Sequence, residues 1–288
     1  MADGGQIHLK RRATGDGFDV IYRTSPVAAL LVGRDLDEAE AVVASHHARD
    51  AIAHRVALAR AWAGDEASPA RRAAWAMREL AEQARNEAGR AAAHFGRGAD
   101  AGALVAPVER AERALGRALG STESTREAMR PDAGALATAV AELGRSFATV
   151  VDALPRERAD ERALPAEARE VVAAARQAPA SLLARLDDEL PRLATRVEVE
   201  PPLPRASEGA GTGTAFTVAG RVTYGLRLVA GCVSAAGCTT PAERLFKPGG
   251  VAAELLARFR GDAPALAMVV AALDPSLSWT LAGAVADA

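Results

Sequence analysis

Hydrophobic and polar residues alternate near both ends of this chain, and they follow a helical period through most of the region between. Two roughly alternating runs within residues 6–23 flank a Gly-Asp-Gly sequence, which is typical of a β-hairpin turn. Residues 214–229 alternate as well and predict a second small hairpin that turns near Gly220. We therefore expect short strands at both ends of a helical body.

Apolar positions at helical spacing mark that body. The first helical region begins at Asp35 or Asp37, either of which is a good N-cap, and ends at Gly64. A second helix spans about residues 68–95, where a Ser-Pro pair opens it and a glycine follows it. Further helices are expected at 104–119, 121–154, 165–190 and 250–259, and immediately before Asp274.

Proline and glycine divide the helical body. Pro131 is expected to break the helix at 121–154, and Pro179 to interrupt the helix at 165–190, because proline removes a backbone donor. Three prolines and a glycine-rich tail within residues 195–213 predict a connector.

The pattern predicts a mainly α fold, a helical bundle with short peripheral β-hairpins. Hydrophobic residues make up 49% of the chain but aromatic residues only 4%, so close packing of alanine-rich helices must supply much of the burial. We interpret the chain as a single domain. Its parts are a hairpin at 6–23, a bundle at 35–190, the connector at 195–213, and a C-terminal hairpin with helices at 214–282.

Charge and cysteine content exclude several classes of function. The net charge of -2 gives no overall field that would attract nucleic acid. No apolar run is long enough to span a bilayer, and no apolar leader follows Met1. The two cysteines, Cys232 and Cys238, match neither a zinc ribbon nor a thioredoxin motif. We expect a cytoplasmic protein without membrane insertion.

The second helix carries charged residues of both signs. We interpret them as a solvated face with i,i+3 and i,i+4 ion pairs. They are Arg71, Arg72, Arg78, Arg85, Arg90, Glu79, Glu82 and Glu87.

A candidate metal set lies in the first helical region. His47, Asp50 and His54 are spaced i, i+3 and i+7, which places them on one face of a continuous helix. Imidazole and carboxylate ligands suit a borderline or hard metal. The alternative is an alanine-rich helix whose polar residues cap it or form local hydrogen bonds.

Two segments near the C-terminus resemble the large subunit of [NiFe] hydrogenases. That family carries a Pro-Thr-Glu-Trp-Asn-Phe-His-Pro segment, followed further on by Ser-Phe-Asp-Pro-Cys-x-x-Cys-x-x-His, whose two thiolates hold metal. The positions kept here are Pro241, Glu243, Phe246, Pro248, Gly249, Asp274 and Pro275. The two cysteine positions are instead Ser276 and Trp279.

An N-terminal segment shows the same resemblance and the same loss. The family has a Gly-Arg-Asp-Pro-x-x-Ala segment before Arg-Ile-Cys-Gly-Val-Cys-x-x-x-His. Here Arg34 lies in a Gly-Arg-Asp sequence, and alignment on His54 places the two cysteine positions on His47 and Asp50. Because soft thiolates select nickel and iron, we predict that the chain is neither a hydrogenase nor another enzyme.

The chain is similar to the HupK/HoxV-type hydrogenase maturation proteins, which are truncated paralogues of the large subunit. This resemblance implies a truncated large-subunit-like domain over residues 1–288 that acts as scaffold or chaperone in [NiFe] cofactor assembly. It implies a transient iron-cyanide-carbonyl precursor as the only cofactor, and a HypC-type chaperone and HypD as partners. The residues implied around the vestigial pocket are Arg34, Cys238, Glu243, Asp274 and Ser276.

Two other roles stay open. In the first, the chain is a degenerate structural or regulatory subunit that docks an Fe-S small subunit. In the second, it is a metalloenzyme that uses His47, Asp50 and His54.

Overall fold

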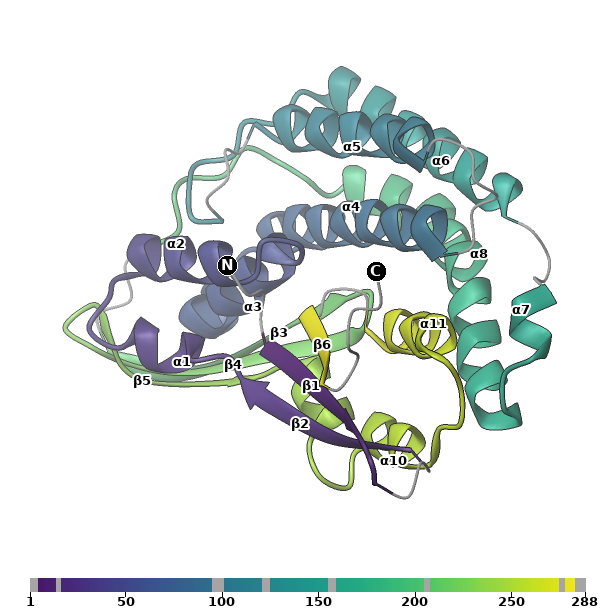
Figure 1. Cartoon of the computed structure of the whole chain (residues 1–288). Coiled ribbons are helices and arrows are strands. Elements are labelled where there is room, and N and C mark those ends of the chain that lie inside the picture. Colours follow the sequence, from purple (N-terminus) through teal and green to yellow (C-terminus); the bar gives the residue numbers. More distant parts are fainter. Residues whose placement is uncertain are drawn as a thin grey trace.

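The computed structural model describes residues 5–13, 17–94, 101–120, 125–154, 159–204, 208–274 and 278–282. Helices account for most of this part of the chain, and two small sheets accompany them (Figure 1). None of the described helices combines the length and the apolarity that a bilayer crossing requires.

A long central helix, α4 (Pro69–His94), organises the molecule (Figure 1). The helices α5 (Ala101–Ala118), α6 (Ala133–Ala153) and α8 (Ala166–Ala194) pack with it around one hydrophobic core. The α4 side of this core consists largely of alanines together with Met77 and Leu80. The expected close packing of alanine-rich helices is confirmed here.

The first helical region is divided into separate helices. Helix α1 (Val27–Leu31) precedes α2 (Leu36–His46), and α3 (Ala51–Ala63) ends at Gly64 before a 3-10 turn over residues 64–66. Asp35 caps α2 as predicted, because its side chain accepts the backbone N–H of Glu38. The prediction of one continuous helix to Gly64 is wrong, since residues 47–50 form a bend between α2 and α3.

A three-stranded antiparallel sheet covers α3 in place of the predicted second hairpin. Its strands β3 (Gly209–Thr217), β4 (Gly220–Val229) and β5 (Cys232–Thr239) lie in the order β3-β4-β5. The turn lies before Gly220 as predicted, but β3 begins inside the predicted connector and β5 was not expected. This sheet shares a core with α1, α2 and α3, so it is not peripheral.

Glycine explains how β3 approaches α3 so closely. A Cβ atom on Gly213 would stand 1.9 Å from the carbonyl oxygen of Ala57, and one on Gly211 would stand 2.0 Å from that of Ala61. Neither distance is sterically possible, so only glycine fits at these positions.

The predicted N-terminal hairpin belongs to a second sheet. Strands β1 (Gly5–Arg11) and β2 (Phe18–Thr24) pair antiparallel, and β6 (Ser278–Ala282) pairs parallel to the other edge of β1. Near this sheet lie three further helices, and together they enclose a third core (Figure 1). These helices are α9 (Pro241–Phe246), α10 (Val251–Arg258) and α11 (Ala263–Leu273).

The middle of the chain departs from prediction at its prolines. Residues 125–132 are not helical, and α6 begins only after its N-cap Asp132. The short α7 (Ala159–Arg162) precedes α8, which continues through Pro179 to Ala194. The expected interruption at Pro179 is therefore wrong.

A side chain of α4 compensates for Pro179. Proline at this position leaves the carbonyl of Ala175, four residues earlier, without its helical donor. The Nη2 group of Arg90 donates to that carbonyl and also to the carboxylate of Glu87. Helix α8 thus stays intact because a neighbouring helix supplies the missing hydrogen bond.

The charged face of α4 is largely buried, which corrects its interpretation as a solvated face. Glu79 accepts the backbone N–H of Phe216 in β3 at 2.8 Å, and Gln83 donates to the carbonyl of Phe216 at 2.8 Å. Arg71 donates to the carbonyls of Thr125 and Glu127, each at 3.0 Å. These side chains attach the surrounding elements to α4, which lies at the centre of the fold.

Candidate functional site

The bend between α2 and α3 places two histidines against each other. His47 ends α2, and His54 lies one turn inside α3. Their imidazole rings stack with 3.5 Å between centroids and 12° between planes. Because the helix is interrupted here, the predicted common helix face of His47, Asp50 and His54 is wrong.

His54 connects this bend to the β3-β4-β5 sheet. A hydrogen bond of 2.8 Å joins its Nδ1 atom to the hydroxyl of Tyr224 in β4. The same hydroxyl is hydrogen-bonded to the thiol of Cys238 in β5. An imidazole, a phenol and a thiol therefore form one buried chain across three elements.

Burial keeps the side chains of His47, His54, Tyr224 and Cys238 uncharged at neutral pH. Burial and then the neighbouring His46 lower the pKa of His47 to about 4. Burial and then His47 lower the pKa of His54 well below its ordinary value. Burial raises the pKa of Tyr224 and raises the pKa of Cys238 to about 11. The thiol of Cys238 is therefore protonated and is a poor metal ligand in this state.

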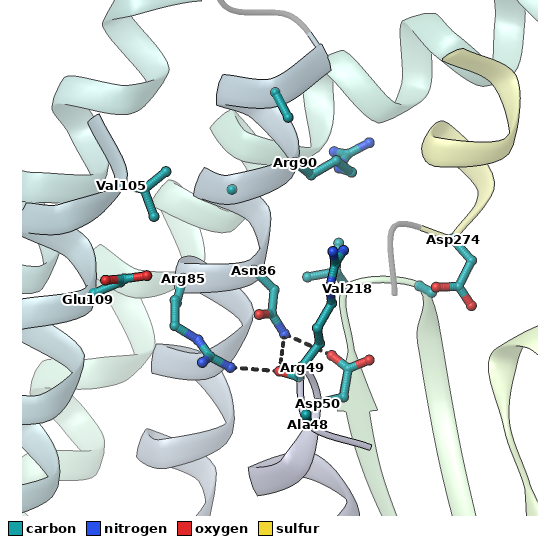
Figure 2. Close-up of a pocket in the computed structure, with 13 residues that line it drawn as sticks. Ala48, Arg49, Asp50, Arg85, Asn86, Arg90, Val105, Glu109, Val218 and Asp274 are labelled. Carbon is teal, nitrogen blue, oxygen red and sulfur yellow. Dashed lines mark hydrogen bonds between the residues drawn. The ribbon is translucent and has the colours of Figure 1, made fainter. Parts of the chain in front are cut away.

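Three side chains of α4 hold the bend in place. Asn86 donates to the carbonyl of Arg49 at 2.9 Å and to Oδ1 of Asp50 at 2.8 Å, as Figure 2 shows. Arg85 donates to the same Arg49 carbonyl at 2.6 Å. The carboxylate of Glu82 accepts the backbone N–H groups of Ile52 and Ala53, in the first turn of α3, at 2.8 and 2.7 Å. Glu82 therefore caps α3 from a neighbouring helix.

Burial raises the pKa of Glu82, and the carboxylate of Asp50 raises it further. The two backbone N–H groups and the guanidinium of Arg85 act in the opposite direction. Two carboxyl groups thus lie close together beneath the bend, and the capped end of α3 partly offsets their repulsion.

The bend and the end of α11 meet at one pocket. This cavity of about 400 Å³ is lined by Asp50 from the bend and by Asp274, the residue that follows α11. Figure 2 shows the two aspartates on different elements, with Arg90 of α4 also at the pocket. The structure thus brings together one residue from each of the two sequence segments that resemble metal-binding frames.

Other predicted residues gather around Tyr22 in β2. Burial is the main cause of its raised pKa, and its hydrogen bond with Thr240 opposes the rise. Glu243, Asp274 and Cys238 also disfavour the ionisation of Tyr22 and so raise its pKa further, which places all three within electrostatic range of one hydroxyl. These predicted pocket residues therefore surround a common region, although of the three only Asp274 lines the pocket itself.

Two predicted pocket residues stand apart. Arg34 lies between α1 and α2, and its Nε atom donates to the carbonyl of Leu30 at 2.8 Å. It therefore closes the end of α1 and does not line the pocket. Ser276 lies outside the described residues. Trp279, the other position without its cysteine, lies in β6 opposite Ile7 of β1.

The donor groups do not fit a nickel-iron centre. Such a centre needs soft thiolate ligands, and the chain has only Cys232 and Cys238. Neither lines the pocket, and the thiol of Cys238 is held by Tyr224. Within the part of the chain that the structure describes, no three His, Cys, Asp or Glu side chains are grouped as metal ligands. The structure therefore gives no support to the predicted metal set.

Sequence reasoning missed Glu82, Asn86 and Tyr224. Glu82 and Asn86 lie on α4 at the helical spacing of i and i+4. The charged residues around them give this segment the pattern of an exposed helix surface. Tyr224 is 0% exposed at the centre of an alternating strand, where a buried phenol needs a partner. The requirement of a buried tyrosine hydroxyl for a hydrogen-bond partner was the one feature of the sequence that could have indicated a polar contact here.

Comparison with solved structures identifies the type of fold. The chain aligns with the Ni-Fe-Se hydrogenase of D. vulgaris Hildenborough at a TM-score of 0.60 and 9% identity, covering 90% of this chain and 93% of the other. It aligns with the reduced, active Ni-Fe-Se hydrogenase of Desulfomicrobium baculatum at a TM-score of 0.61 and 8% identity, covering 91% and 94%. The fold is therefore hydrogenase large-subunit-like.

Comparisons of sequence give no further relative. No protein-family model matches the chain, and no curated protein matches it. At 8–9% identity, the structural likeness establishes the fold alone.

Proposed function

We propose that this chain is a non-catalytic scaffold or chaperone in the assembly of the [NiFe] cofactor, of the HupK/HoxV type. The observation that carries the proposal is the pocket shared by Asp50 and Asp274 in a hydrogenase-like fold. In the resemblance, Asp50 stands at a cysteine position of the family and Asp274 keeps the aspartate of its C-terminal metal-binding segment.

The contacts at the bend support a non-catalytic role. His47 and Asp50 occupy the positions of two metal thiolates in the resemblance, and both are engaged within the protein. His47 stacks on His54, and Asp50 accepts a hydrogen bond from Asn86. A site held by such internal contacts keeps its shape without metal, which suits a protein that offers the outline of a large subunit to assembly factors.

The partners proposed are a HypC-type chaperone and HypD. The only cofactor proposed is an iron-cyanide-carbonyl precursor, held transiently. The arginine side chains of the pocket would donate hydrogen bonds to the cyanide ligands of a charged precursor, and the carboxylates of Asp50 and Asp274 would bind its iron through oxygen without a thiolate bond.

Partner capture tests the proposal. The tagged chain is purified anaerobically from its native host, and the proteins bound to it are identified by mass spectrometry. We expect HypC-type and HypD proteins to be recovered. Stable recovery of an Fe-S small subunit without maturation proteins would contradict the proposal and would favour the role of a docking subunit.

Infrared spectra of the same preparation test the transient precursor. Bands in the cyanide and carbonyl region are expected in the wild type and should weaken when Asp50→Asn and Asp274→Asn are combined. Asp188→Asn, at an exposed position of α8, serves as the matched control and should keep the bands. Bands that survive the double substitution would show that the precursor is held elsewhere.

A further inference from the structure

A second cavity lies beside the site, between α4 and α5. It measures about 480 Å³, and Ile52 at the start of α3 closes one side of it. It shares Arg85 and Glu109 with the pocket of Asp50 and Asp274. Its charged lining consists of Arg78, Arg85, Arg113, Arg117, Glu109 and Glu112.

Arg78 is the unusual member of this lining. Its side chain lies on α4 and is only 8% exposed, and its Nη1 atom is buried without a hydrogen-bond partner among the described residues. Arginine remains charged when buried, and the carboxylates of Glu40, Glu82 and Glu112 act on this charge, yet the Nη1 group has no hydrogen-bond acceptor. An anion in the cavity would supply that acceptor.

The two carboxylates of the cavity already have cationic partners. Glu112 lies 3.4 Å from Arg85, and Glu109 lies 3.8 Å from Arg113. Arg117 is exposed on the same helix, one turn beyond Arg113. Four arginines and two glutamates leave an excess of two positive charges around the cavity.

We propose that this cavity binds the phosphate group of a small phosphorylated molecule. A phosphate monoester carries about two negative charges at neutral pH, which matches the excess of the lining. Arg78 meets the phosphate at the buried end of the cavity through its planar donor group, and Arg117 meets it from the rim. The cavity is larger than a single phosphate requires, so it has room for the organic part of the molecule.

Binding of three probes tests the proposal, measured by calorimetry at constant ionic strength. The probes are inorganic phosphate, ribose 5-phosphate and ribose. We expect ribose 5-phosphate to bind at least as tightly as inorganic phosphate, and ribose not to bind. Binding of inorganic phosphate alone would limit the site to the free ion, and absence of binding at about 10 mM of either phosphate would overturn the proposal.

Matched substitutions on α5 locate the site without disturbing the core. Arg117→Gln removes a lining arginine, whereas Arg110→Gln removes an exposed arginine of the same helix that does not line the cavity. We expect Arg117→Gln to weaken binding about threefold to tenfold, and Arg110→Gln to leave it unchanged. Equal losses in the two variants would contradict the assignment.

Arg78→Met tests the buried end of the cavity. It should weaken phosphate binding by at least about tenfold, because a charge-assisted hydrogen bond is lost. Without phosphate, the melting temperature should fall, since the carboxylates of Glu40, Glu82 and Glu112 lose a neighbouring buried cation. Retained affinity in a folded Arg78→Met protein would overturn the proposal, and the α5 pair decides the matter if this variant does not fold.

Discussion

The two histidines of this site and the tyrosine and cysteine linked to them are buried and uncharged at neutral pH. His47 and His54 stack as neutral rings, and Tyr224 links His54 to the thiol of Cys238. In the resembled family, the position aligned with His47 is a cysteine whose thiolate binds metal. Here it is an imidazole that packs on the ring of His54.

The lowered pKa of His47 predicts a loss of stability in acid. The unfolded chain binds a proton near pH 6.5, whereas the folded chain does not do so until about pH 4. The contribution of His47 to the free energy of unfolding is therefore present above pH 6.5 and is lost as the pH falls through that window.

His47→Phe keeps the ring but cannot titrate. Between pH 7 and pH 4.5 we expect it to lose about 2 kcal/mol less stability than the wild type, in urea unfolding followed by circular dichroism. His8→Phe in β1 is the control and should follow the wild type. Parallel pH curves for His47→Phe and the wild type would show that His47 is not buried as a neutral ring.

Tyr224→Phe removes the hydroxyl that joins His54 to Cys238. It should lower the free energy of unfolding by about 1–3 kcal/mol, because two buried polar groups lose their partner. Tyr22→Phe provides the comparison, since its hydroxyl lies 3.4 Å from Thr240 at a half-buried position and should cost less. A smaller loss at Tyr224 than at Tyr22 would mean that the hydrogen bonds linking His54, Tyr224 and Cys238 contribute little to the free energy of unfolding.

At the level of elements, the close approach of β3 to α3 sets the position of the sheet. Gly213→Ala would place a methyl group against the backbone of α3, so we expect a loss of about 1–3 kcal/mol or more in thermal unfolding. Gly225→Ala, in β4, has open space around its Cβ position and is the matched control. Similar melting temperatures for the two variants would contradict the packing described here.

The sequence pattern predicted those helices and strands that form because of residues close to one another in the sequence. Alternation predicted β1 and β2, and the N-cap Asp35 marked the start of α2. Long-range causes were not visible in the sequence. Strand β6 forms by pairing with β1 across nearly the whole chain, and α8 survives Pro179 because Arg90 of another helix serves the freed carbonyl.

The residues of the site also divide into those that the sequence indicated and those that depend on long-range contacts. Sequence reasoning selected Asp50 and Asp274, which line one pocket, because the resemblance placed both in metal-binding frames. It missed Glu82 and Asn86, because a charged helix surrounded by other elements has the same residue pattern as an exposed one. Arg34 was selected for its motif, yet its side chain donates to the end of α1 and does not line the pocket.

At the level of the whole molecule, α4 stands among three hydrophobic cores, and its polar side chains reach the elements around it. The fold is hydrogenase large-subunit-like, while His47 and Asp50, at two of the aligned ligand positions, contact His54 and Asn86 of the protein itself. Such a chain keeps the shape of a large subunit without the donors of its metal centre.

Nickel content tests this account most directly. The protein is purified anaerobically from its native host, and nickel is measured by mass spectrometry of the acid-digested sample against the protein concentration. The account predicts nickel far below one ion per chain, because no thiolate set is present to hold it. Nickel retained at one ion per chain through gel filtration would contradict it and would restore a metal centre to this fold.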